Sequence, residues 1–255
     1  MKKIIAIDVG NSETTVGVGS SNGWTGYRFT TRKTITSDEL LMMFKTIIDL
    51  KPTEENLIEG GVICSVVPQI TNSVATATSK FISKEVTVVG PGVKTGLKVN
   101  IDNPKELGPD RIANSIGGYI KAQSPVVIVD LGTATTFDLV NEKKEYLGGA
   151  IAPGIKISLD ALNARTSSLK SVELETPKNV VGKNTYEAIQ SGLIFGHTSM
   201  IDSMIEKIIL ESGLKPKIFI TGGLGKVIHP LMNIKSKYEE DLTLDGLEEI
   251  YKLNN

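Results

Sequence analysis

The chain has 255 residues, of which 40% are hydrophobic and 22% are charged, with a net charge of -1 and one cysteine. This balance is typical of a globular protein and gives no electrostatic reason to expect binding to nucleic acid or to an acidic membrane. A single cysteine excludes an internal disulfide framework and fits a reducing compartment. The apolar run after Lys3 ends at Asp8, too early for a signal peptide, and no later run could span a bilayer. We therefore expect a cytoplasmic protein.

The first half of the sequence predicts three strands followed by mixed helices and strands. The strands are expected at residues 3–9, 13–19 and 24–31, with glycine-containing turns between them. Thr36 and Glu39 form a capping box, which predicts that a helix begins there. Next we expect a strand at 57–67, a helix at 70–83, a short strand at 85–89 and a glycine-rich surface loop at 90–103.

The second half begins after Ser124-Pro125 and repeats the opening pattern. Strands are expected at 125–131, 135–140 and 145–151, then helices around 154–163 and 182–210. A strand at 217–221 and a C-terminal helix from about Leu244 complete the chain. The glycine turn at 221–225 (TGGLG) suits the close approach of a nucleoside, although an ordinary strand-to-helix turn accounts for it on its own.

An internal repeat relates the two halves. An offset of 122 residues places Asp8 on Asp130, Gly10 on Gly132, Asn11 on Thr133 and Thr14 on Thr136. Short matches of this kind arise by chance, but two that open the same strand–strand–strand–helix order are rarely accidental. We predict a duplicated α/β unit, with an N-terminal half at residues 1–121 and a C-terminal half at residues 122–255.

Each repeat places an aspartate at the end of a buried strand, directly before a glycine turn. Glycine lets a polyanion come close to free backbone N–H groups, and the second loop, 130–136 (DLGTATT), adds three hydroxyl donors. Two such loops facing each other would hold phosphates, and Asp8 and Asp130 would hold cations that offset the phosphate charge. One loop alone is more simply a hairpin turn with an Asx motif, so it is the pair that favours phosphate binding.

A third candidate segment, Gly108-Pro109-Asp110-Arg111, precedes apolar residues at helical spacing. Proline suits the first helical position, and Asp110 then lies in the positive field of the helix N-terminus, which favours its ionised form. A carboxylate beside Arg111 could accept a proton from an alcohol while the guanidinium holds an anion. A capping aspartate with a solvated arginine neighbour explains the same spacing and stays open.

Other catalytic patterns fit the sequence poorly. Residues 19–23 (GSSNG) match the serine-hydrolase elbow but lie between two predicted strands. His197 and His229 are the only histidines, and neither they nor Cys64 has metal-ligand spacing. There is no Walker A lysine motif and no complete GxGxxG, which argues against P-loop and Rossmann folds.

The order of the motifs resembles that of type III pantothenate kinases over nearly the whole chain. The matching segments are Asp8-Val9-Gly10-Asn11, Ser65-Val66-Val67-Pro68, Gly90-Pro91-Gly92, Gly108-x-Asp110-Arg111, Asp130-x-Gly132-Thr133-Ala134-Thr135-Thr136, Gly148-Gly149-x-Ile151-x-Pro153-Gly154, Gly182-Lys183-Asn184-Thr185, Thr221-Gly222-Gly223 and Asp241-Leu242-Thr243. The resemblance implies a duplicated actin-like (ribonuclease-H-like, ASKHA) α/β fold with two βββαβα-type halves. It implies ATP-dependent phosphorylation of pantothenate to 4'-phosphopantothenate, the first step of coenzyme A biosynthesis. It also implies Mg²⁺, a monovalent cation (K⁺ or NH₄⁺) and a homodimer with the substrate pocket near the interface.

Residue roles are implied by position in the same resemblance. ATP contacts fall on Asp8, Val9, Gly10, Asn11, Ser12, Glu13, Thr14, Thr15 and Thr133. Pantothenate contacts fall on Gly108, Pro109, Asp110, Arg111 and Thr185, with Asp110 as the proton acceptor and Asp130 as the monovalent-cation ligand. Three positions depart from the family pattern: Ser12 replaces a threonine, Pro109 replaces an alanine, and Ile101 replaces a substrate-contacting tyrosine. The last change alters the expected pocket but removes no catalytic group.

Two other hypotheses compete with the kinase. One is a catalytically weak accessory or regulatory member of the same family that binds nucleotide or pantothenate. Loss of Asp110 or Asp130 would indicate it, and both are present. The other is a cytoskeletal or chaperone-like nucleotide switch of the actin-like class, which is generally a longer protein with inserted subdomains.

Overall fold

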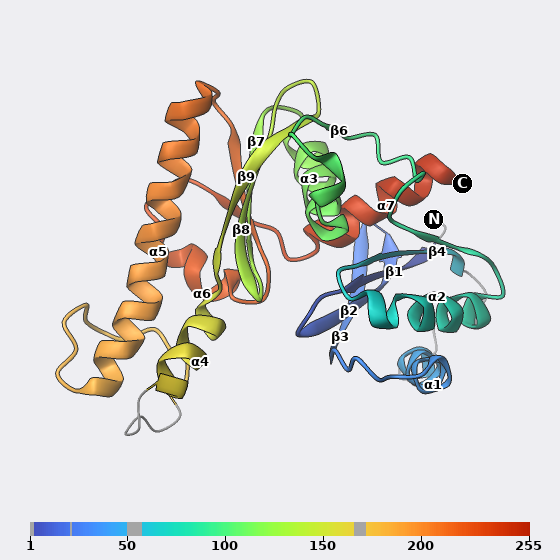
Figure 1. Ribbon diagram of the computed structural model, residues 1–255, viewed down its shortest axis with the longest axis horizontal. Helices are drawn as coiled ribbons and strands as arrows, with labels where there is room; N and C mark the ends of the chain where they lie inside the picture. The colour runs from blue at the N-terminus through green and yellow to red at the C-terminus, as the bar shows by residue number, and fades with distance from the viewer. Residues whose placement is uncertain (1–2, 21, 50–57, 166–171) are drawn as a thin grey trace. The chain divides into compact units, whose positions relative to one another are not determined.

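The computed structural model describes residues 3–20, 22–49, 58–165 and 172–255 (Figure 1). The chain divides into two compact units: unit 1 contains Met1–Lys121 and Asp241–Asn255, and unit 2 contains Ala122–Glu240. The sequence assigns residues 241–255 to the second half, whereas the structure packs them in unit 1. Gly17 and Gly60 explain this, because their missing side chains leave room for Leu244 and for the Tyr251 ring of the C-terminal helix.

Unit 1 is built on a five-stranded sheet with the order β3-β2-β1-β4-β5. Strands β1 and β2, and β2 and β3, are antiparallel, while β4 runs parallel to both β1 and β5. Its elements are β1 (Lys3–Val9), β2 (Glu13–Ser20), β3 (Gly23–Thr30), α1 (Ser37–Asp49), β4 (Ile58–Ser65), α2 (Pro68–Ile82), β5 (Val86–Val88), β6 (Lys98–Val99), η2 (Pro104–Glu106), α3 (Pro109–Ala122) and α7 (Leu242–Asn254).

The core of unit 1 follows from the alternation of its strands. Ile5, Ile7 and Val9 point to the face covered by α1 and α2, where they pack with Phe44 and Val74. Helix α1 begins at the predicted capping box: the Glu39 carboxylate accepts from the Thr36 N–H at 2.8 Å, and the Glu39 N–H donates to the Thr36 hydroxyl at 3.3 Å.

Helices α3 and α7 pack closely because both carry glycine at their contact. A Cβ added at Gly117 would meet the Leu242 carbonyl, and one at Gly246 would meet that of Ala113. The Asp245 carboxylate of α7 then accepts from the Trp24 indole and pairs with Lys121, each at 2.8 Å. These contacts anchor α3, which carries the Gly108–Arg111 segment at its start.

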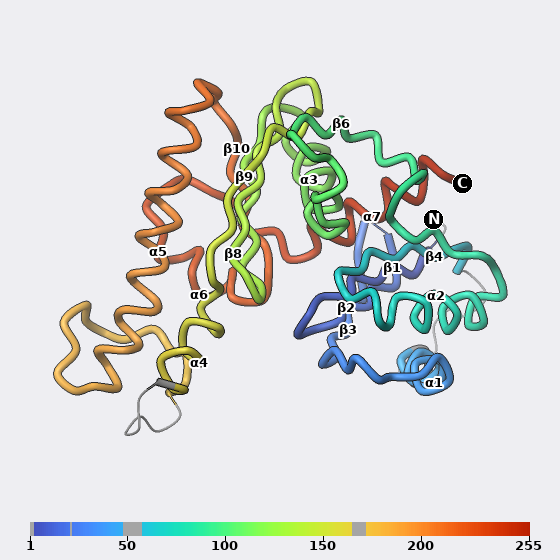
Figure 2. The backbone as a smooth tube through the Cα atoms, viewed as in Figure 1, coloured from blue at the N-terminus to red at the C-terminus, as the bar shows by residue number. Residues whose placement is uncertain are grey.

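The strands of unit 2 follow one another in the second sheet in the matching order β9-β8-β7-β10-β11. Strands β7, β8 and β9 form an antiparallel meander, and β10 runs parallel to both β7 and β11; Figure 2 shows the three meander strands side by side. Its elements are β7 (Val126–Leu131), β8 (Ala134–Val140), β9 (Glu145–Pro153), α4 (Ile155–Arg165), α5 (Thr185–Ser212), β10 (Lys217–Thr221), α6 (Gly225–Ile228), η3 (His229–Leu231) and β11 (Lys237–Tyr238).

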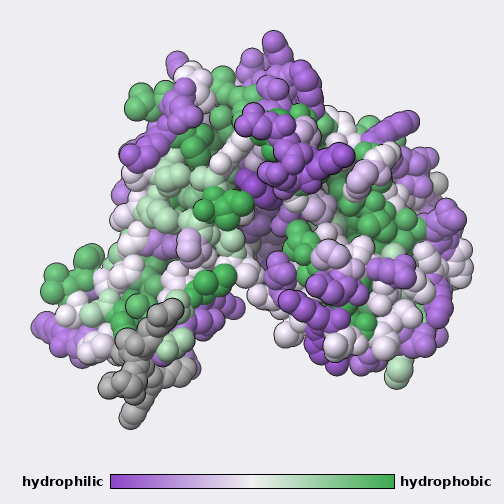
Figure 3. All heavy atoms as spheres, in the orientation of Figure 1, coloured by the Kyte–Doolittle hydropathy of each residue, from purple (hydrophilic) through white to green (hydrophobic). Residues whose placement is uncertain are grey.

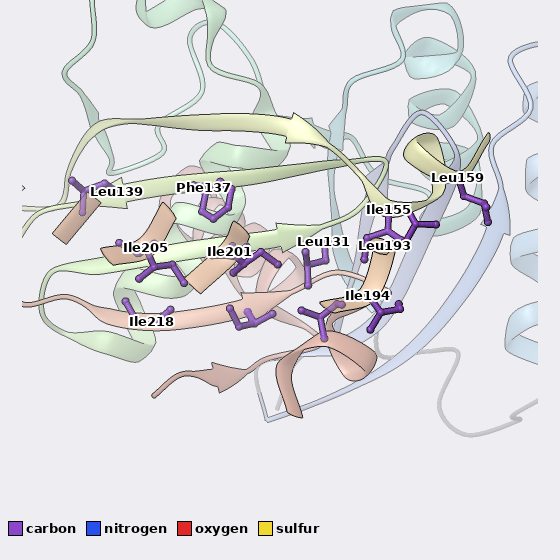
Figure 4. Packing of buried hydrophobic residues seen from close by; sticks show 14 of the residues in the cluster. Leu131, Phe137, Leu139, Ile155, Leu159, Leu193, Ile194, Ile201, Ile205 and Ile218 are labelled. Atoms are coloured by element: carbon purple, nitrogen blue, oxygen red, sulfur yellow. The ribbon is translucent and has the colours of Figure 1, made fainter. Parts of the chain in front are cut away.

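The core of unit 2 lies between the sheet and the long helix α5 (Figure 4). Leu131 and Phe137 project from the sheet toward Ile194, Ile201 and Ile205 on the helix, all nearly or fully buried. Helix α5 ends at Gly213, whose φ of 66° suits glycine. Neither α5 nor any other described helix combines the length and the apolar character that a bilayer crossing requires.

The strand order confirms the duplication, but the register corrects the sequence alignment by one residue. Val9 pairs with Thr14 across the first turn, whereas Leu131 pairs with Thr135 across the second. The second turn is therefore one residue shorter, and beyond it the offset is 121. Thr14 corresponds to Thr135, not to Thr136 as the sequence alignment predicts.

Candidate functional site

The first candidate loop joins β1 to β2 and is closed by a short backbone hydrogen bond. The Gly10 N–H donates to the Glu13 carbonyl at 3.0 Å, and a Cβ on Gly10 would lie 2.8 Å from that oxygen. Only glycine fits this turn without a shift of the backbone. Asn11, Ser12 and Glu13 are exposed at its tip, where a ligand could reach them.

Val9 and Thr14, both expected to contact ATP, flank this turn but have buried side chains. Val9 packs in the core, and its carbonyl accepts from the Val66 N–H at 3.0 Å. The Thr14 hydroxyl hydrogen-bonds to Thr31 at 2.8 Å. These two residues thus anchor the two ends of the loop in the interior of unit 1.

Asp8 lies at the centre of a polar row that crosses three strands of unit 1. It pairs with Thr15 on β2 and with Cys64 on β4. The Cys64 thiol donates to the Asp8 Oδ1 atom at 3.1 Å. The pKa of Asp8 is raised to about 6, chiefly by burial; the thiol hydrogen bond acts to lower it, and the charges of Asp110 and Glu13 act with burial to raise it. Asp8 and Asp110 therefore lie close enough to interact electrostatically.

Asp110 is the second residue of helix α3, which begins at Pro109. The Gly108 carbonyl accepts from the Ile112 N–H at 3.0 Å, so Gly108 occupies the capping position and Asp110 does not. The Asp110 Oδ1 atom instead accepts from the Arg111 N–H at 2.8 Å. A side chain at Gly108 would come within 2.5 Å of the same carboxylate oxygen. Glycine at 108 is thus required for the position of Asp110.

The pKa of Asp110 differs in direction from the expectation based on the helix N-terminus. Burial raises the pKa above its ordinary value, and it outweighs the lowering by the Arg111 backbone N–H and by the Arg111 charge. A partly buried carboxylate with a raised pKa binds a proton more readily than an exposed one. This makes Asp110 a better proton acceptor than the sequence alone indicates.

The second candidate loop, in unit 2, has a matching polar row. Asp130 on β7 pairs with Thr136 on β8 and with Thr221 on β10. After Thr221 the chain turns at Gly222, whose φ is 87° and whose Cβ would lie 2.5 Å from the Asp130 Oδ1 atom. The turn at 221–225 therefore packs directly against Asp130, a contact that requires glycine.

Thr133 stands exposed at the tip of the second loop. The Gly132 N–H donates to the Ala134 carbonyl at 3.1 Å, and the Gly154 N–H donates to the Thr133 carbonyl at 3.2 Å. The Thr133 backbone is thus fixed while its side chain remains accessible.

Thr185 is the first residue of α5 and is exposed. The Asn184 side chain caps the helix by accepting from the Glu187 N–H at 2.9 Å. Ile101, the position that departs from the family pattern, is half-buried in unit 1 between β6 and η2. The structure thus brings Asp8, the first loop and Asp110 together in unit 1, and Asp130, Thr133 and Gly222 together in unit 2.

Two residues that sequence reasoning missed contact the first loop and its aspartate. Cys64, on β4, donates a hydrogen bond to Asp8, and Thr31, directly after β3, donates one to the Gly10 carbonyl. For Cys64 the signal lies in the pairing of two predicted strands, because the parallel alignment of β1 with β4 places residue 64 beside residue 8.

Comparisons with known proteins give a consistent result. The family model described as type III pantothenate kinase matches residues 4–207. A protein named type III pantothenate kinase from Pelobacter propionicus is 39% identical over 252 residues, covering 98% of this chain and 99% of that protein. One of the same name from Halalkalibacterium halodurans is 40% identical with the same coverage.

Solved structures share the fold at low sequence identity. A conserved putative Baf family transcriptional activator from Campylobacter jejuni is 20% identical with a TM-score of 0.61, covering 98% of each chain. Component A of the (R)-2-hydroxyglutaryl-CoA dehydratase from Acidaminococcus fermentans is 10% identical with a TM-score of 0.54, covering 98% of this chain and 97% of that one. These similarities, with the repeated sheet order, show the duplicated actin-like fold that the motif order implies.

Proposed function

The chain belongs to the type III pantothenate kinase family, which phosphorylates pantothenate with ATP in coenzyme A biosynthesis, and on this premise we propose how its residues carry out that reaction. Phosphoryl transfer asks a protein mainly to position the two substrates and to stabilise charge, with a base accepting the hydroxyl proton. The observation that carries the proposal is the placement of Asp8, the first loop and Asp110 in one unit.

Asp110 is the proposed proton acceptor for the pantothenate hydroxyl. Its carboxylate is held by the Arg111 N–H, and burial raises its pKa, so it takes up a proton readily as the new P–O bond forms. Gly108, Pro109 and Arg111 would contact pantothenate from the same turn, with the Arg111 guanidinium pairing with the substrate carboxylate. Thr185, exposed in unit 2, is proposed as a further substrate contact.

The two loops are the proposed phosphate contacts. In unit 1 the exposed tip of Asn11, Ser12 and Glu13 would face the phosphates, and Thr133 is the corresponding contact in unit 2. Because the side chains of Val9 and Thr14 are buried, they would act through the backbone and the shape of the loop.

The residues present also fit a magnesium ion bound together with ATP. Among the described residues, no cluster of three or more His, Cys, Asp or Glu side chains is arranged to hold a metal. Mg²⁺ in kinases is usually held by one or two carboxylates and the substrate phosphates, and Asp8 can supply such a carboxylate. Bound Mg²⁺ would neutralise charge on the phosphates. Asp130 is the proposed ligand of a monovalent cation, K⁺ or NH₄⁺.

The experiment that tests the activity is a measurement of ADP release. We expect release that depends on pantothenate and is absent with other small alcohols. ADP release without any acceptor would indicate a nucleotide switch. A protein that binds ATP but releases no ADP, with or without pantothenate, would be an accessory protein.

We also propose a homodimer formed through unit 2. Ile151, Val180, Val181 and Tyr186 are between 42% and 80% exposed, although all are large and hydrophobic. Figure 3 shows hydrophobic side chains at the surface around α4 and the adjoining end of α5. Light scattering should give about twice 27.4 kDa at micromolar concentration, and the replacement of Val181 by Asp should shift it toward the monomer. A monomer in the unsubstituted protein contradicts the proposal.

A cytoplasmic location is proposed as well. Cys64, the only cysteine of the chain, is a free and buried thiol, as a reducing compartment allows. Cell fractionation with an antibody against the chain would test it.

A further inference from the structure

Thr31, the residue directly after β3, holds the first phosphate loop by three hydrogen bonds. Its hydroxyl donates to the Gly10 carbonyl at 2.7 Å and lies 2.8 Å from the Thr14 hydroxyl. Its backbone N–H donates to the Ser12 carbonyl at 3.0 Å. One residue thus contacts both ends and the tip of the turn between β1 and β2.

The direction of these bonds follows from the number of protons. The Gly10 carbonyl can only accept, so the single hydroxyl proton of Thr31 is committed to it. The Thr14 hydroxyl must then donate to Thr31. Thr14 is only 7% exposed, and its own proton is used inside the protein. The pair therefore forms a directed chain from Thr14 through Thr31 to Gly10.

This chain fixes the orientation of the peptide unit that joins Gly10 to Asn11. In a trans peptide the C=O and N–H bonds point in opposite directions, and the described chain contains no cis peptide. With the Gly10 oxygen held on Thr31, the Asn11 N–H points away from β3, on the exposed tip of the loop. The Ser12 carbonyl accepts from the Thr31 N–H, so the Glu13 N–H of the same trans peptide also points away from β3.

The corresponding position in unit 2 is a glycine and has no hydroxyl. Gly154 follows β9 as Thr31 follows β3, and its N–H donates to the Thr133 carbonyl at 3.2 Å. A Cβ at Gly154 would lie 2.6 Å from the Gly132 carbonyl and would also meet that of Thr133. The shorter second loop occupies the space that the Thr31 side chain fills in unit 1.

We propose that Thr31 is a positioning residue for ATP: its hydroxyl orients the Gly10–Asn11 peptide so that the Asn11 N–H faces the nucleotide phosphates. This inference rests on the proposed assignment of the first loop to ATP. Thr31 contacts the backbone of the loop, and it would affect ATP binding only through the orientation of that backbone.

The test compares three variants. Thr31→Val removes the hydroxyl and keeps the shape, Thr31→Ser keeps the hydroxyl, and Thr30→Val makes the same change at the exposed neighbouring threonine. For Thr31→Val we expect the Kd for ATP, measured by calorimetry without pantothenate, to rise roughly three- to tenfold. The KM for ATP should rise with it, while the KM for pantothenate stays within about twofold. Thr31→Ser and Thr30→Val should bind ATP like the unsubstituted protein.

The outcomes separate positioning from general stability. If Thr31→Val leaves the Kd for ATP unchanged, or if Thr31→Ser weakens binding as much as Thr31→Val does, the proposal is overturned. Should the valine variant fail to fold, Thr31→Ala against Thr31→Ser gives the same comparison. Because calorimetry needs no phosphate acceptor, a protein that binds ATP but does not phosphorylate pantothenate would contradict the proposed function and leave this test intact.

Discussion

Units 1 and 2 share one strand order but differ at the ends of their strands, where ligands would bind. Each sheet carries a polar row with a central aspartate, Thr15–Asp8–Cys64 in unit 1 and Thr136–Asp130–Thr221 in unit 2. In unit 1 a thiol donates to the aspartate. In unit 2 a glycine turn packs against it. The duplicated sheet thus supplies two similar platforms, and the residues after each strand decide what each platform does.

The difference extends to the helices that complete the two repeats. Helix α3 ends the first repeat and places Asp110 at its second position, near Asp8. Helix α7 ends the second repeat and has Thr243 at its second position, where the hydroxyl donates to Asn114 at 2.6 Å. The candidate base therefore exists in only one repeat, and duplication of the sheet did not duplicate the chemistry.

The largest expected effect concerns this asymmetry. Asp110→Asn should lower kcat by roughly 10²–10⁴ because it removes the proton acceptor but keeps the size of the side chain. Calorimetry should show nearly unchanged ATP binding, since the phosphate loops are intact. Asp102→Asn, an exposed aspartate of the same unit, is the matched control and should keep full activity. If Asp110→Asn retained more than about a tenth of the kcat, Asp110 would not be the base.

A second prediction tests the shorter loop of unit 2. Gly154→Ala should lower the free energy of unfolding by about 1–3 kcal/mol, because the new methyl group would press on the Gly132 carbonyl. Gly192→Ala, in open space on α5, should instead raise it by about 0.4–1 kcal/mol. Urea denaturation of both variants measures the difference, and equal changes would show that crowding at Gly154 is unimportant.

The buried Asp8 predicts a stability that depends on pH. Its pKa rises from 3.8 to about 6 on folding, so its ionisation weakens the fold, an effect absent below pH 3.8 and complete above about pH 6. This pKa shift limits the loss in the free energy of unfolding to about 3 kcal/mol. We expect Asp8→Asn to raise the free energy of unfolding by about 1–2 kcal/mol at pH 7.5. The gain should vanish near pH 4 while activity is lost at every pH. A gain that is equal at both pH values would contradict the burial effect.

The smallest expected effect concerns the cation of unit 2. We expect K⁺ and NH₄⁺ to activate turnover and Na⁺ to do so poorly, with Asp130→Asn raising the K⁺ concentration for half-maximal activity about five- to tenfold. Asp160→Asn, exposed on α4, is the control. Equal rates in the three salts would remove the assignment of the cation to Asp130.

The sequence by itself determined the segments and the sites that depend on local order. Strands β1 and β10 begin and end at the predicted residues, and the capping box at Thr36 forms as expected. The aspartates at the ends of β1 and β7, the glycines that follow them and the start of α3 at Pro109 were also predictable. These features depend on hydrophobic periodicity, on backbone preferences of glycine and proline and on repetition, all of which lie within short stretches of sequence.

Only the tertiary structure decided which distant residues meet. Cys64 lies 56 residues from the Asp8 that it contacts, Thr31 lies 21 residues from Gly10, and Asp245 of α7 lies 221 residues from Trp24. The one-residue shift between the two loops and the raised pKa of Asp110 were likewise hidden in the sequence. Register, burial and side-chain hydrogen bonds are set by how whole segments pack, and a local pattern does not carry that information.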